Sequence, residues 1–170
     1  RKGQPKPRIY GAVKNVAPVL VNTSRLIYQI HDGALQAVGA VYDRGAALTA
    51  GTAYTSESDM QTNAPSAGQY RVWLAGGMFR LGSLPTGQVT ADATEGAAAA
   101  SRYAGALLSR IAQQMGLTSG EVSAADVSAL DTAAPYELGA AVQGDETALA
   151  VMSRIAESVG AWFGVDRLGV

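Results

Sequence analysis

His31 is the only histidine in the chain, so any catalytic base or metal site that needs an imidazole must use it. It is followed by Asp32 and Gly33, and a histidine with a nearby carboxylate could in principle serve as a general base. No G-x-S-x-G motif supplies a serine nucleophile, and the lack of cysteine excludes thiolate chemistry and disulfides alike. We therefore interpret His31 and Asp32 as a polar pair at the end of a strand, where the chain enters a turn.

The carboxylates are scattered along the chain instead of forming a motif. Asp92 and Glu95 are three residues apart, and Asp145 and Glu146 are adjacent at the start of a predicted helix. An acid at a helix N-terminus is stabilised by the helix dipole and needs no metal to explain it. A pair of carboxylates for glycoside cleavage remains open, although no acid lies in an aromatic-rich segment that would hold a sugar. We expect no metal, no cofactor and no enzymatic activity.

Basic residues are concentrated within the first 14 positions, where no acid occurs. They are Arg1, Lys2, Lys6, Arg8 and Lys14, five of the 13 basic residues in a chain of net charge -1. A basic arm on an acidic body could bind nucleic acid, but no aromatic residue for base stacking occurs before Tyr10, and no lysine lies in a phosphate-binding loop. We predict an extended arm without specific nucleic-acid binding, and take Lys6, Arg8 and Lys14 as candidate partner contacts.

Two tryptophans are the other conspicuous side chains. Trp73 lies on a predicted hairpin that also carries Arg71 and Arg80, and large rings beside arginine are typical of interface hot spots. Because one face of this hairpin should be solvated, Trp73 could be either a core residue or a contact residue. We take Arg71, Trp73 and Arg80 as further candidate partner contacts. Trp162, next to Phe163 on a predicted final strand, is interpreted as a core residue.

The elements that must position these residues change in type near residue 95. Before it, short segments rich in Ile, Val, Leu and Tyr predict strands at residues 8–13, 18–22, 26–31, 36–42, 46–49, 69–74, 78–81 and 88–94. Turns are predicted at residues 43–45 and 75–77 because glycine accepts a positive φ. Ser56 is suited to cap a short helix. These signals predict an antiparallel sheet or a small β-barrel.

After Gly96 the hydrophobic residues recur with the period of a helix. One predicted helix buries Ala104, Leu107, Leu108, Ile111 and Met115 and ends at Gly116. A short helix is predicted to start at Ser123, which has capping-box spacing to Asp126, and to end near Asp131.

A further helix is predicted to be capped by Asp145 and to end at Gly160. Its expected buried stripe is Ala148, Met152, Ile155 and Val159. Residues 136–142 and 161–165 predict strands. The whole is an α+β fold, with a β-rich module at residues 1–95 and a small α+β module with two main helices at residues 96–170.

The bulk composition is that of a globular protein with a surface suited to association. Hydrophobic residues make up 48% of the 170 residues, while charged residues make up only 16%, below the usual quarter. A surface so poor in charge is expected to be covered in part by a partner. No apolar run approaches the ~20 residues of a membrane-spanning helix. Both ends look cut, so we expect a fragment of a longer chain.

Several segments taken together resemble a known family. They are QPKPRIYG (residues 4–11), VKNV (13–16), PVLV (18–21), YQIHDG (28–33), YRVWLAGGMFRLG (70–82), VTAD (89–92) and VGAWF (159–163), together with Pro85, Gly87, Leu130, Asp131, Pro135, Gly139 and Arg167. This set resembles a stretch of the large tail proteins of siphophages, prophages and gene transfer agents. The resemblance covers nearly the whole chain and consists of structural residues without a catalytic motif.

The resemblance implies a structural component of a bacteriophage tail tip or baseplate. Such a hub-like module contacts the distal tail protein, the tape measure and fibres, and is commonly a trimer around the tail axis. We therefore expect a homo-oligomer in the virion tail, assembled in the bacterial cytoplasm. Two alternatives stay open: a cell-wall hydrolase, and a host-surface carbohydrate- or receptor-binding module. The binding module would require Arg71, Trp73 and Arg80 to be exposed on a concave face.

Overall fold

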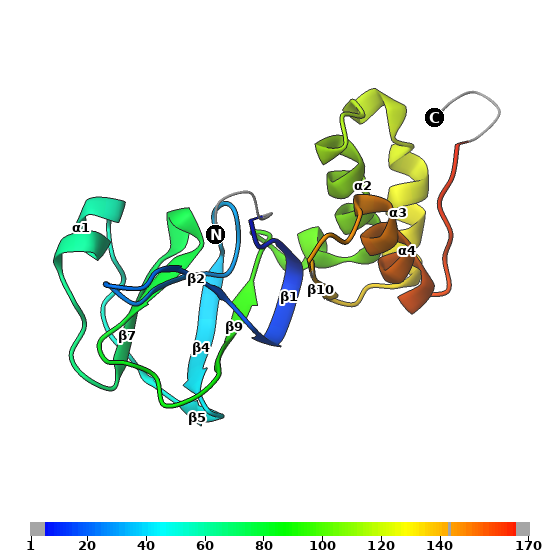
Figure 1. Ribbon diagram of the computed structural model, residues 1–170. Coiled ribbons are helices and arrows are strands. Elements are labelled where there is room, and N and C mark those ends of the chain that lie inside the picture. Colours follow the sequence, from blue (N-terminus) through cyan, green and yellow to red (C-terminus); the bar gives the residue numbers. More distant parts are fainter. Residues whose placement is uncertain (1–5, 143, 166–170) are drawn as a thin grey trace.

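The computed structural model describes residues 6–142 and 144–165 of the chain. A β-rich part and a helical part lie side by side, with β1 and β10 between them (Figure 1). The predicted α+β fold class is confirmed.

Two five-stranded sheets form the β-rich part. The first contains, in spatial order, β10 (Gly139–Ala141), β1 (Ile9–Val16), β9 (Val89–Thr94), β4 (Ala37–Asp43) and β5 (Ala46–Ala47). The second contains β2 (Val19–Asn22), β3 (Ile27–Gln29), β8 (Met78–Leu81), β7 (Gln69–Trp73) and β6 (Thr49–Ala50). The pairings are antiparallel except that of β6 with β7, which is parallel because the link between them, through α1 (Glu57–Thr62), returns the chain in its original direction.

A hydrophobic core fills the space between the two sheets. Ile9 and Val41 enter it from the first sheet, and Tyr28 and Phe79 from the second, with their two rings stacked 5.3 Å apart. Strand β9 alternates between buried and half-buried positions along its whole length, as its sequence predicts. Leu48 alone separates β5 from β6, so one short segment carries the chain from one sheet to the other.

The predicted turns are confirmed in their local geometry. Arg44 and Gly45 have φ of 53° and 81°, which makes a two-residue turn between β4 and β5. A 3-10 turn, η1 (Leu74–Gly76), and Gly77 at φ 62° join β7 to β8. Ser56 caps α1, since its hydroxyl accepts the Asp59 N–H at 3.1 Å.

The helical part contains α2 (Ala104–Gln114), α3 (Ala124–Ala133) and α4 (Ala148–Ser158), with 3-10 turns η2 (Ala99–Arg102) and η3 (Ser119–Glu121). Three helices of similar length thus stand where two main helices and a short one are predicted. Ser123 caps α3 as expected, accepting the Asp126 N–H at 3.3 Å, and the helix continues to Ala133. Gly116 and Gly160 follow α2 and α4 with positive φ, as predicted.

Details of two helices differ from the prediction. The cap of α4 is Thr147, whose hydroxyl accepts the Ala150 N–H at 3.2 Å, so the assignment of Asp145 is wrong. Threonine is placed directly before the first helical residue, whereas Asp145 lies too early to reach the free amides. On α2, Met115 is 46% exposed instead of buried, because it is already the C-terminal cap and no longer follows the helical face.

The buried face of α4 is also shifted by part of a turn. Met152 and Ile155 are buried as predicted, and Val151 and Ala156 complete the face. Ala148 and Val159, the two ends of the predicted stripe, are only half-buried.

The predicted final strand at residues 161–165 is wrong. Ala161 and Phe163 pack against the helical core, while Trp162, predicted to be buried, is 85% exposed. An extended segment becomes a strand only where a neighbouring edge offers hydrogen bonds, and here its apolar side chains cover the helices. The other predicted strand of this half, at residues 136–142, is shortened to β10.

The two halves of the chain share one sheet. Strand β10 comes from the second half, yet it pairs with β1, bringing Gly139 opposite Gly11. A second core lies among the helices, and it includes Tyr10 from β1 and Ala140 from β10. The division of the chain at residue 95 stays a prediction. Arg1 and Lys2 of the basic arm, and Arg167 of the segments that carry the resemblance, lie outside the described residues.

Candidate interaction sites

The basic arm is bound to the body of the protein through Asp32. Lys6 donates to one carboxylate oxygen of Asp32 at 2.9 Å, and the Arg8 guanidinium lies 3.9 Å from the other. Arg8 also donates to the Gln114 side chain at 2.8 Å. Lys14 is exposed on β1, and its ammonium makes no hydrogen bond or ion pair with any residue that the structure describes. Of the three candidate contacts on the arm, only Lys14 therefore presents an uncompensated charge.

Arg71 is engaged within the chain. Its Nε donates to the Thr52 carbonyl at 2.6 Å, and its guanidinium lies 4.0 Å above the centre of the Tyr54 ring. It also lies 3.8 Å from the Asp59 carboxylate, with only 21% of its side chain exposed. Arg71 thus fastens the α1 segment to the second sheet.

Arg80, which is paired with Arg71 across β7 and β8, and Trp73 fasten the same segment. Arg80 donates to the carbonyls of Met60 and Gln61 at 2.8 and 3.1 Å. Trp73 is half-buried and packs on a small cluster that includes Met60, with its ring lying against Gly76. The three candidate contacts on this hairpin are half-buried and hold α1 in place.

His31 is a buried structural side chain at the end of β3. This position agrees with the interpretation of His31 and Asp32 as a polar pair where the chain enters a turn. It is 8% exposed, and its Nδ1 accepts the Ile9 N–H at 3.1 Å. The accepting nitrogen carries no proton, so the neutral ring has its hydrogen on Nε2. Among the described residues, no serine or threonine hydrogen-bonds to this imidazole.

Burial is the main reason why the pKa of His31 is lowered from its ordinary value. The positive charges of Arg8 and Arg110 act in the same direction. The carboxylates of Glu95 and Asp32 oppose the change without reversing it. The imidazole is therefore neutral at neutral pH.

The carboxylates mostly satisfy backbone or guanidinium groups. Asp43 accepts the N–H groups of Thr86 and Gly87 at 2.7 and 2.9 Å, and the Thr86 bond is the main cause of its lowered pKa. A hydrogen bond from Arg102 at 2.7 Å is the main cause of the lowered pKa of Glu137. Across residues 6–142 and 144–165, no three His, Asp or Glu side chains gather as a possible metal site. No helix in these ranges is long and apolar enough to cross a lipid bilayer.

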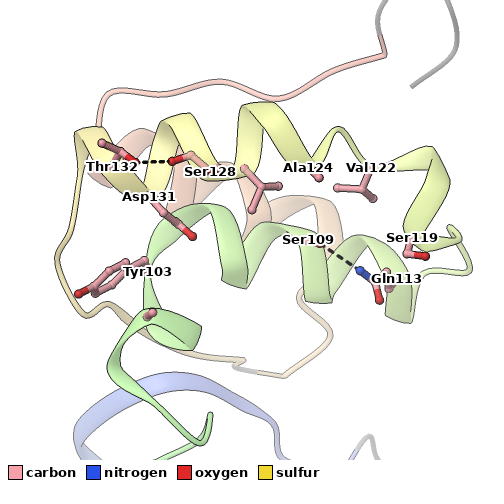
Figure 2. A pocket seen from close by; sticks show the side chains of 11 residues that line it. Tyr103, Ser109, Gln113, Ser119, Val122, Ala124, Ser128, Asp131 and Thr132 are labelled. Atoms are coloured by element: carbon pink, nitrogen blue, oxygen red, sulfur yellow. Dashed lines mark hydrogen bonds between the residues drawn. The ribbon is translucent and has the colours of Figure 1, made fainter.

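A groove of about 520 Å³ runs between α2 and α3. Figure 2 shows Tyr103 at one end of it and Gln113 and Ser119 at the other, with the hydroxyls of Ser128 and Thr132 along the α3 side. No motif in the sequence indicates this groove, because its shape depends on how α2 packs against α3.

Asp131 forms a hydrogen bond between the two helices. Figure 2 shows its side chain directed from α3 toward α2, where one oxygen accepts the Gly105 N–H at 2.7 Å. Tyr103 is the N-cap residue of α2, and its side chain makes no capping hydrogen bond, so Asp131 supplies the side-chain cap of this helix. A Cβ on Gly105 would lie 2.6 Å from the Val127 carbonyl, so a glycine is needed at this contact.

Large apolar side chains remain exposed on the described surface. They include Trp162 at 85%, Leu84 at 77%, Tyr136 at 67% and Leu149 at 54% exposure. The low content of charged residues is the sequence signal for such a surface, although it does not say which residues are exposed.

No protein-family model, curated protein or solved structure matches the chain. The function is therefore inferred from its own residues and their arrangement.

Proposed function

We propose that the chain is a structural, hub-like assembly module of a bacteriophage tail tip or baseplate, without enzymatic activity. The observation that carries the proposal is the set of large apolar side chains left exposed around a packed body, with Trp162 and Leu84 foremost. Side chains of this kind are suited to be covered by neighbouring subunits. The phage context comes from the sequence segments that resemble siphophage tail proteins.

The internal bonding of the ionisable residues also supports an assembly role. His31, Asp43 and Asp131 each accept backbone N–H groups, so these ionisable side chains complete the hydrogen bonding of the fold. The partners proposed for this module are the distal tail protein, the tape measure and fibres. The proposed state is a homo-oligomer, a trimer around the tail axis.

Immunogold electron microscopy of the source particles tests the location. Antibody raised against this chain is expected to label the tail tip only. Label at fibre ends, or none on opened particles, would contradict the proposal. A clear zone around the purified chain in peptidoglycan zymography would contradict the absence of enzymatic activity.

Lys14 is the residue with which to test docking of the basic arm. Reversing Lys6 or Arg8 would also break their contacts with Asp32, whereas Lys14→Glu changes only an uncompensated charge. We expect Lys14→Glu to reduce incorporation into particles, measured by immunoblotting of purified virions. Arg44→Glu makes the same charge change on the exposed β4–β5 turn and is expected to incorporate normally. Equal incorporation of both variants would exclude docking through Lys14.

A second candidate function is host-surface carbohydrate binding, favoured by the groove between α2 and α3. Its lining combines the Tyr103 ring with the hydroxyls of Ser128 and Thr132, groups that suit a polyhydroxyl ligand. Glycan-array binding that is lost in Tyr103→Ala would favour this function, while an array without signal would exclude it for the glycans tested.

A further inference from the structure

The first strand is held in place by a hydrogen bond that depends on the protonation state of a histidine. Nδ1 of His31 accepts the Ile9 N–H at 3.1 Å, and both residues are buried, at 8% and 1% exposure. An imidazolium carries hydrogens on both nitrogens and accepts nothing. Protonation in place would therefore bring two N–H groups face to face in a site largely closed to water.

Two further contacts join the segment beside this bond to the same loop. Asp32, the next residue after His31, donates its backbone N–H to the Pro7 carbonyl at 2.8 Å and accepts from Lys6 at 2.9 Å. Three successive hydrogen bonds thus join residues 6–9 to the His31 loop. The bond from the Ile9 N–H to His31 is a buried one.

The same segment lies where the two hydrophobic cores meet. Ile9 belongs to the core between the sheets, and Tyr10 belongs to the helical core. The Val142 N–H, just after β10, donates to the Arg8 carbonyl at 2.9 Å. A change at the start of β1 therefore reaches both parts of the molecule.

The charged groups that act on His31 are two carboxylates, Glu95 and Asp32, and two guanidiniums, Arg8 and Arg110. Arg8 and Asp32 lie on its own side of the junction, and Glu95, at the end of β9, is bound to Arg110 of α2 at 2.7 and 2.9 Å. Because these groups supply no net negative charge that would favour protonation, burial keeps the ring neutral. A protonated ring is stable only where it reaches water.

We propose that His31 is a pH-sensitive latch: the neutral ring holds the start of β1 against the body, and protonation releases residues 6–9 and loosens the junction between the sheets and the helices. The closed state resists protonation, while the open state titrates near the ordinary histidine value of about 6.5. By linkage, the equilibrium constant for opening rises by up to about tenfold per pH unit below that value, until the lowered pKa of the closed state is reached.

Amide hydrogen exchange at Ile9, measured by NMR in the full chain, tests the latch. After correction for the intrinsic pH dependence of exchange, the protection factor of Ile9 is expected to fall between about pH 7.5 and about pH 5, by at most about tenfold for each pH unit between about 6.5 and the lowered pKa of the closed state. The Phe79 amide, in the middle of the second sheet, is expected to keep its protection. The matched variant is His31→Asn, whose Oδ1 takes the position of Nδ1 as an acceptor and cannot titrate in this range, so its Ile9 protection should stay constant.

Two outcomes would overturn the latch: unchanged protection of Ile9 in the wild type, or an equal fall in His31→Asn. If that variant does not fold, NMR of the His31 imidazole in the wild-type protein tests the proposal directly. Because His31 is the only histidine, its ring nitrogen resonances need no assignment. An unprotonated Nδ1 near neutral pH, with a midpoint below about 6.5 that coincides with loss of Ile9 protection, supports the proposal. A proton on Nδ1 near neutral pH, or a titration that leaves Ile9 protection unchanged, overturns it.

Discussion

At the scale of single residues, the ionisable side chains of this protein mainly complete the hydrogen bonding of its backbone. Asp131 is the clearest case, since it lies on α3 and caps the first turn of α2 through the Gly105 N–H at 2.7 Å. A carboxylate at this position also compensates the positive end of the helix dipole. From the sequence alone, Asp131 is one more acidic residue in a predicted helix. In the structure its bond to Gly105 joins α3 to α2.

Replacing Asp131 should lower the free energy of unfolding by about the amount that a helix cap contributes. We expect Asp131→Ala to lower the free energy of unfolding by about 1–2 kcal/mol and Asp131→Asn by less, because the amide oxygen still accepts. Urea denaturation followed by circular dichroism measures both. Asp145→Ala, at an exposed acid outside the helices, should change the value by less than about 0.5 kcal/mol. Equal losses for Asp131→Ala and Asp145→Ala would contradict the capping role.

At the scale of secondary-structure elements, the contact between β1 and β10 joins the two halves of the chain. The strands approach so closely that a Cβ on Gly139 would overlap the Ala12 carbonyl, and one on Gly11 would overlap the Leu138 carbonyl. A second link runs from the end of β9 to α2, where Glu95 binds Arg110 and also accepts the Gly11 N–H at 3.1 Å. Both links involve the backbone of β1 near Gly11.

The close approach predicts a position where only glycine is tolerated. Gly139→Ala should lower the free energy of unfolding by about 1–3 kcal/mol, because the added methyl group forces β10 away from β1. Gly120→Ala is the matched control, since Gly120 also lacks a positive φ and a Cβ there would meet nothing within 4 Å. Thermal unfolding of both variants gives the comparison. A loss at Gly120 as large as that at Gly139 would show that the strand contact is unimportant.

The Glu95–Arg110 pair should show measurable coupling in a double-mutant cycle. Its side chains are only 16% and 30% exposed, and removal of Glu95 leaves both Arg110 and the Gly11 N–H without this partner. We expect a coupling energy of about 1–3 kcal/mol in Ala substitutions, measured by denaturant unfolding. The more exposed Lys6–Asp32 pair should couple by only about 0.2–1 kcal/mol. A weaker coupling for Glu95–Arg110 than for Lys6–Asp32 would contradict the structural link.

At the scale of the whole molecule, a packed body coexists with large apolar side chains that the chain itself does not cover. Trp162 lies outside the helical core while its neighbour Phe163 packs against it, and Leu84 follows β8 at 77% exposure. Figure 1 shows the segment after α4 running along the outer side of the helical part. Such a surface fits a module whose neighbours in an assembly complete its burial.

Trp162 should contribute to association and not to folding. We expect Trp162→Ser to change the free energy of unfolding by less than about 0.5 kcal/mol, whereas Phe79→Ala, in the core, should cost about 3–5 kcal/mol. Sedimentation velocity over a range of concentrations should show weaker self-association of Trp162→Ser than of the wild type. A loss of stability in Trp162→Ser comparable to that of Phe79→Ala would assign this ring to the core.

The sequence by itself determined most strands of the first half, two of their turns and the caps of two helices. The strand predicted at residues 46–49 is wrong, because β5 and β6 divide these residues between the two sheets. Arg44-Gly45, Ser56 and Ser123 were predictable because a turn or a cap depends on a few consecutive residues and on the φ values that they allow. The alternation along β9 likewise predicts which of its side chains are buried, because successive side chains of a strand point to opposite faces.

Only the tertiary structure decided which segments meet. The pairing of β10 with β1, the exposure of Trp162, the cap that Asp131 supplies to α2 and the bond between His31 and Ile9 all join residues far apart in the chain or depend on what covers them. Sheet pairing and burial are set by the surfaces that distant segments offer each other, and no local pattern records that choice. For the same reason the candidate contacts Arg71 and Arg80 were recognisable as arginines beside a tryptophan, while their bonds to the α1 segment were not.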